Sequence, residues 1–145
     1  MTQDQRGRGR LTVRVAAGLG TLPVEGAIVH VKPYYESGGA GDILYSLRTD
    51  ESGLTDSVLL PAPPRELSQA PETPVLPYAE YNVTVFKDGY RITENIGVPV
   101  FDGISSVQTV NLIPLAEGAD GNGETVYYEN ESFSNLNDGL SGGAT

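Results

Sequence analysis

Apolar and polar residues alternate with a period of two along most of the chain between residues 11 and 115. Successive side chains of a β-strand point to opposite faces, so this alternation indicates half-buried strands, and no long stretch repeats with the helical period of about 3.6 residues. In one segment Ala27, Val29 and Val31 fall on one face and Ile28, His30 and Lys32 on the other. The pattern predicts seven strands, at residues 11–15, 27–32, 43–48, 55–60, 81–86, 91–100 and 105–113.

Turn-forming residues separate these segments. Residues 50–53 read Asp-Glu-Ser-Gly, and Asp-Gly pairs occur at 88–89 and 102–103. Asp bonds its own backbone two residues on and Gly tolerates positive φ, so both residue types favour turns. Several short strands with regular turn signals are typical of an antiparallel sandwich. We therefore expect an all-β fold, a seven-stranded antiparallel β-sandwich spanning residues 11–115.

A proline-rich segment interrupts the pattern at residues 61–78, which hold six prolines. Proline lacks the amide donor that a sheet requires, so this segment is predicted to be a long loop. Loops of this length in a compact domain are usually functional or disordered.

The two ends of the chain differ in charge. Residues 1–10 hold three Arg and one Asp, a net +2, and residues 116–145 hold six acids and no Lys or Arg, a net −6. We expect a flexible basic arm at 1–10 and a flexible acidic, Gly-rich tail at 116–145. The formal charge of the whole chain is −10, which disfavours a nucleic-acid partner.

The chain has no stretch of about 20 apolar residues, so no membrane partner is expected. The first ten residues lack the apolar region of a secretory signal, and the prediction is synthesis in the cytoplasm without a signal peptide.

Four segments together resemble the carboxypeptidase regulatory-like, or transthyretin-like, domain, which is a seven-stranded sandwich: residues 22–29, 49–53, 81–90 and 107–115. Three segments are similar, more narrowly, to the domain that precedes the catalytic part of clostridial spore cortex-lytic enzymes: residues 55–64, 77–85 and 97–114. This resemblance implies incorporation in the spore. In that family the domain accompanies a peptidoglycan-cleaving module, and no such module is expected here.

Candidate catalytic chemistry is sparse. The sequence has one histidine, His30, and no cysteine. The transthyretin-like superfamily includes an isourate-type hydrolase that uses several histidines, and a sandwich-fold dioxygenase needs iron held by His and Tyr. Neither set can be assembled from His30 alone, so the predictions are no enzyme, no cofactor and no metal site.

One acidic pattern leaves weak calcium binding open. Asp120, Asn122, Glu124 and Glu131 have the offsets of a calcium loop, but Thr125 stands where such a loop requires Gly.

The function expected is that of a non-enzymatic structural or interaction protein. Its partners would be copies of itself or other spore-layer proteins, and residues 1–10 or 125–128 would add a strand to the sheet edge of another chain. The alternative is a peptidoglycan- or carbohydrate-binding module that acts beside a separate lytic enzyme. The candidate partner-binding residues for the two hypotheses are Tyr34, Tyr35, Tyr45, Tyr78, Val126, Tyr127 and Tyr128.

Overall fold

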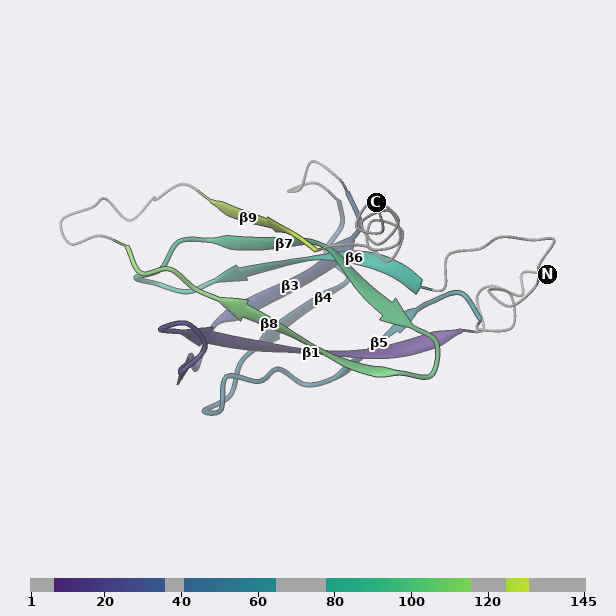
Figure 1. The fold of residues 1–145 in the computed structure, drawn as a ribbon, viewed down its shortest axis with the longest axis horizontal. Helices are drawn as coiled ribbons and strands as arrows, with labels where there is room; N and C mark the ends of the chain where they lie inside the picture. The colour runs from purple at the N-terminus through teal and green to yellow at the C-terminus, as the bar shows by residue number, and fades with distance from the viewer. Residues whose placement is uncertain (1–6, 36–40, 65–77, 116–124, 131–145) are drawn as a thin grey trace, which may run out of the picture.

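The computed structural model describes residues 7–35, 41–64, 78–115 and 125–130, which fold into two stacked β-sheets (Figure 1). In Figure 1, β1 and β8 lie in the lower layer, and β6, β7 and β9 lie in the upper layer. These residues form strands, turns and loops but no helix, so none of them builds a helix that could span a membrane.

The first sheet is built around β1 (Arg8–Ala17). One edge of β1 pairs antiparallel with β2 (Leu22–Pro23) and β5 (Val58–Pro61). The other edge pairs in parallel with β8 (Ser105–Asn111) over seven residue pairs. Among the described strands β8 is the outermost on its side, so one of its edges faces away from the sheet.

The second sheet has five strands in the order β4 (Tyr45–Arg48), β3 (Ile28–Pro33), β6 (Tyr78–Phe86), β7 (Thr93–Phe101) and β9 (Val126–Glu129). Neighbours are antiparallel except β7 and β9, which are parallel. The β6–β7 register shifts between Tyr81 and Val83, where Gly97 of β7 adopts a φ of +80°. This bulge matters for the site described below.

The core lies between the inner faces of the sheets. Valine dominates it because β-branched side chains pack well on a pleated surface. The fully buried side chains of the core include Leu11, Val13, Val15, Val29, Val31, Leu60, Val83, Val85, Val98, Val100 and Val110.

The all-β, two-sheet prediction is confirmed, and each of the seven predicted strands corresponds to one of the observed strands with shifted ends. The described residues contain two further strands, β2 and β9. Most neighbouring strands are antiparallel, as predicted, but β1–β8 and β7–β9 are parallel pairs.

The predicted boundaries also differ from the structure. β1 begins at Arg8, inside the segment expected to be a flexible arm, and β9 lies inside the expected tail. Arg8 and Gly9 pair with Pro61 and Leu60 of β5, and a Cβ at Gly9 would lie 2.3 Å from the Phe101 carbonyl oxygen. Glycine lets β1 pass close to β7. The predictions for residues 1–6, 65–77, 116–124 and 131–145 lie outside the described residues.

Candidate functional site

The outer face of the five-stranded sheet carries a buried polar cluster formed by Lys32, Asn82 and Glu94. Lys32 alternates with core residue Val31 and Asn82 with core residue Val83, and Glu94 pairs with Thr84, which lies on the same face as Asn82. The three side chains therefore point away from the core, yet their residues are only 7%, 0% and 2% exposed. Buried charged residues are rare unless they are paired, so this cluster is the leading candidate site.

The three side chains meet at one oxygen atom. Lys32 Nζ lies 3.5 Å from Glu94 Oε2, and Asn82 Nδ2 donates a hydrogen bond of 3.4 Å to the same oxygen. β3, β6 and β7 are consecutive in the sheet, so one carboxylate links a residue from each of three adjacent strands.

The bulge in β7 supplies a third contact to the Asn82 side chain. The Gly97 amide has no partner in the β6–β7 ladder and instead donates to Asn82 Oδ1 at 3.2 Å. Asn82 Nδ2 also donates to the backbone carbonyl of Tyr35 at 2.9 Å. The Asn82 amide is therefore held in a fixed orientation, with its oxygen facing an N–H donor and its nitrogen facing Glu94.

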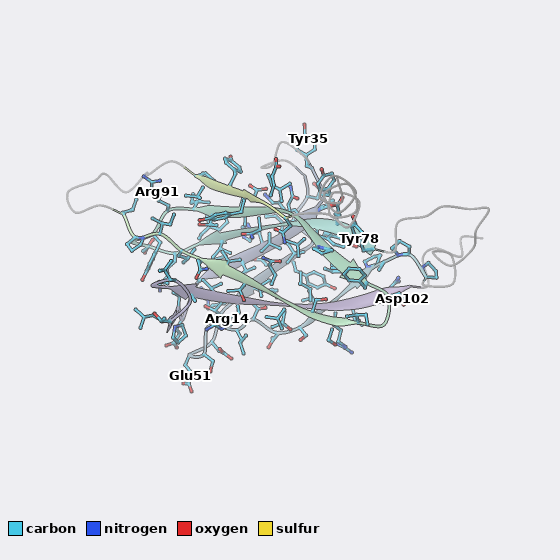
Figure 2. All side chains as sticks on the ribbon, viewed as in Figure 1. Arg14, Tyr35, Glu51, Tyr78, Arg91 and Asp102 are labelled. Atoms are coloured by element: carbon cyan, nitrogen blue, oxygen red, sulfur yellow. The ribbon has the colours of Figure 1, made fainter. Side chains whose placement is uncertain are left out.

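Three of the predicted partner-binding tyrosines surround this cluster. Tyr34 and Tyr35 follow β3, and Tyr127 of β9 is the register partner of Glu94. These tyrosines are 44%, 48% and 54% exposed, and Figure 2 shows Tyr35 projecting from the side opposite Glu51. The Tyr34 ring lies 3.7 Å from where a Cβ of Gly97 would stand. An exposed aromatic surface thus borders a buried charge pair.

The other predicted partner-binding residues lie elsewhere. Tyr45 on edge strand β4 is exposed, and its hydroxyl donates to the Leu59 carbonyl at 3.1 Å. Tyr128 and Val126 lie on β9. Tyr78 is 2% exposed and packs against the Phe101 ring with centroids 5.5 Å apart. Its ring therefore contributes little to the exposed surface, unlike those of the other candidate tyrosines.

Two titratable groups on the same outer face have shifted pKa values. Burial lowers the pKa of His30 below its ordinary 6.5, and the nearby charge of Lys32 lowers it further. Burial raises the pKa of Glu80 above its ordinary 4.5.

The described ranges contain no group of three or more His, Cys, Asp and Glu side chains placed to hold a metal ion. Three of the calcium-spaced residues lie at 120, 122 and 124 and the fourth at 131, all outside those ranges.

A small cavity of about 160 Å³ opens beside edge strand β8. Core residues Leu11 and Val98 reach its floor, and Val107 of β8, itself 62% exposed, stands at its rim. A hydrogen bond of 3.0 Å from Asn130 Nδ2 to Gln108 Oε1 joins the two sheets on this side. Among the described residues, this side-chain bridge therefore spans the two sheets beside the cavity.

Sequence reasoning missed Lys32, Asn82 and Glu94 as a site. The alternation does place Lys32 on an outward face, but it carries no sign that the face is covered. The bulge that turns the Gly97 amide toward Asn82 is signalled only by the glycine itself.

No family model and no curated protein matches this chain. Among solved structures, catechol 1,2-dioxygenase from Acinetobacter sp. ADP1 is similar at 17% identity and a TM-score of 0.51, over 88% of this chain and 60% of that one. The minor pilin GBS52 of Streptococcus agalactiae is similar at 14% identity and a TM-score of 0.47, over 79% of this chain and 48% of the pilin. The Bacillus anthracis TIE protein is similar at 15% identity and a TM-score of 0.47, over 75% of this chain and 17% of that protein. The chain spans less than two thirds of each of these proteins, and at such identities the likeness concerns the fold alone.

Proposed function

We propose that this chain is a non-enzymatic structural or interaction protein that joins other copies of itself by exchanging strand β9. The observation that carries the proposal is that β9 is a short strand added in parallel at the edge of a complete sheet. In finer terms we propose a transthyretin-like sandwich that is incorporated in the spore, which rests on the sequence resemblance.

β9 is held mainly through its backbone. Four residue pairs join it to β7, and the amides of Val126 and Asn130 donate to the carbonyls of Ile92 and Ile96, each at 2.8 Å. Its side chains contribute less burial, since Tyr127 and Tyr128 are 54% and 41% exposed. Backbone bonds of this kind form equally well with the same strand of another copy, which is the basis of strand exchange.

The chain preceding β9 is long enough for such an exchange. Nine residues, 116–124, connect Leu115 to Thr125. An extended chain spans roughly 3.3 Å per residue, so this connection reaches about 30 Å. That distance is comparable to the width of a small domain, and β9 of one copy can therefore reach β7 of a neighbour.

The test compares two substitutions at one position of the full chain. Val126→Pro removes an amide donor that β9 uses, whereas Val126→Ala keeps it. We expect the Pro variant, but not the Ala variant, to bind a fluorescent peptide of residues 124–131 at its open β7 edge. Light scattering after size exclusion should show concentration-dependent oligomers for the wild type and for Val126→Ala. A wild type that stays monomeric at all concentrations, together with no peptide binding by Val126→Pro, would contradict the proposal.

A second candidate function is binding of peptidoglycan or another carbohydrate. The observation that favours it is the gathering of Tyr34, Tyr35 and Tyr127 on one face, because exposed aromatic rings stack on the apolar faces of sugars. Retention of the chain on purified cortex peptidoglycan tests it. Tyr34→Ala and Tyr127→Ala should reduce retention, and Tyr45→Ala should not, because the Tyr45 hydroxyl reaches the Leu59 carbonyl of the other sheet.

A further inference from the structure

The geometry points to an intramolecular amide bond between the Lys32 side chain and the Asn82 side chain, formed by the protein itself with loss of ammonia. The bond would tie β3 to β6 on the outer face of the five-stranded sheet. It is independent of the strand exchange proposed above, because it involves none of the residues of β9.

The reacting groups are already brought together. Lys32 and Asn82 are register partners in adjacent strands, so their side chains leave the sheet side by side on one face. The Lys32 and Asn82 nitrogens both contact Glu94 Oε2, at 3.5 Å and 3.4 Å. Holding an amine beside an amide in this way replaces a bimolecular encounter and removes part of the barrier to amide exchange between side chains.

Glu94 is placed to carry the protons. Glu94 Oε2 lies 3.5 Å from Lys32 Nζ, so a proton of the Lys32 ammonium can pass to the carboxylate. That transfer leaves a free amine, which is the nucleophilic form of lysine. The Asn82 nitrogen, which must be protonated to leave, contacts the same carboxyl oxygen.

The bulge supplies stabilisation for the negative charge that develops on oxygen. The Gly97 amide donates to Asn82 Oδ1 at 3.2 Å, and this backbone donor is fixed before any reaction begins. Preorganised donors of this kind are the main means by which proteins stabilise tetrahedral intermediates at a carbonyl carbon.

The step balances without any external reagent. The Lys32 Nζ lone pair attacks Asn82 Cγ, and the π electrons of the carbonyl move to Oδ1. Glu94 returns its proton to Nδ2, the carbonyl re-forms, the Cγ–Nδ2 bond breaks with its electron pair, and ammonia leaves. Glu94 takes the surplus proton from Nζ and passes it to the ammonia, so the products are a secondary amide, an ammonium ion and the Glu94 carboxylate.

Mass spectrometry of the denatured full chain tests the bond. We expect the wild type to be lighter than its sequence by one ammonia, on purification or after prolonged incubation of the folded protein. Trypsin should then release peptides 15–48 and 66–87 as one linked pair, since Lys32 lies in the first and Asn82 in the second. The linked pair also separates this reaction from imide formation at Asn122-Gly123, which loses ammonia too but joins no peptides.

Substitutions of Asn82 and Glu94 test the role of each side chain in forming the bond. Asn82→Ala and Glu94→Gln should show the full sequence mass and separate peptides, with folding checked by circular dichroism. Glu80→Gln is the matched control, because Glu80 is a partly buried carboxylate on the same face that should leave the bond intact. A linked pair in Glu94→Gln would overturn the role of Glu94. Free peptide 66–87 from a wild type of full sequence mass would overturn the whole inference, and that measurement needs no variant to fold.

Discussion

The Thr49 hydroxyl accepts a hydrogen bond of 2.9 Å from the Ala27 backbone amide at the end of the sandwich where β3 begins. The same hydroxyl donates to the Val24 carbonyl at 2.7 Å, and Thr49 is only 3% exposed. The backbone of Thr49 pairs with this region as well, donating to Ala27 and accepting from Gly26, each at 3.0 Å. One buried side chain thus satisfies two backbone groups that would otherwise be buried without partners.

Replacing Thr49 with Val should destabilise the fold substantially although the shape of the side chain is kept. The change leaves the Ala27 amide and the Val24 carbonyl unpaired, and each buried orphan costs about 1–3 kcal/mol. Urea denaturation measures the free energy of unfolding. Thr49→Ser is the control, because it keeps the hydroxyl and should lose less. Equal stability of Thr49→Val and the wild type would show that the two hydrogen bonds contribute nothing.

The alternation in β5 predicts opposite outcomes at two adjacent leucines. Leu60 is 1% exposed and belongs to the core, whereas Leu59 is 45% exposed. Leu60→Ala should lower the free energy of unfolding by about 2–5 kcal/mol, since it removes buried methyl groups and leaves a cavity. Leu59→Ala should cost less than about 1 kcal/mol. Comparable losses in the two variants, measured by denaturant titration, would mean that the register of β5 is wrong.

The period-two pattern predicted most of the strands and their buried faces, because a strand with one buried face alternates apolar and polar residues. Val29 and Val31 were predicted to share a face and both are fully buried in the core. Sequence pattern does not encode which strand pairs with which. The parallel pairing of β1 with β8 joins segments about 95 residues apart, as in the pair Arg10 and Ser105, and no local signal specifies it.

The candidate site was less accessible to sequence reasoning for a related reason. Lys32 looks like an ordinary solvated residue of a polar strand face, and its burial depends on tertiary contacts. The burial of Tyr78 likewise depends on Phe101, a residue distant in sequence. The tyrosines at 34, 35 and 127 were singled out by residue type, and their gathering on one face emerges only from the sheet order.

Alanine substitutions at two glycines with positive φ allow the cost of backbone strain to be distinguished from the cost of a steric clash. Gly53 has a φ of +80° and Gly89 a φ of +86°, so alanine is strained at either position by about 1–3 kcal/mol. A Cβ at Gly53 would also lie 2.5 Å from the Val15 carbonyl oxygen, whereas none of the atoms around Gly89 comes within 4 Å. Gly53→Ala should therefore be the more destabilising change. The midpoints of thermal unfolding test this order, and a lower midpoint for Gly89→Ala would contradict it.

His30 should make the fold less stable as the pH falls. Burial, and secondarily the charge of Lys32, lowers the pKa of His30 in the folded state below its ordinary 6.5. Near and below that pH the unfolded chain binds more protons than the folded one, so stability rises with pH and is lost on acidification. Glu80 acts in the opposite sense, because its raised pKa makes the folded state the better proton binder above 4.5. His30→Gln removes only the first contribution. Urea titrations between about pH 7.5 and pH 5 should therefore show the wild type losing more stability than His30→Gln as the pH falls. Parallel pH profiles for the two proteins would mean that the folded and unfolded states protonate His30 equally.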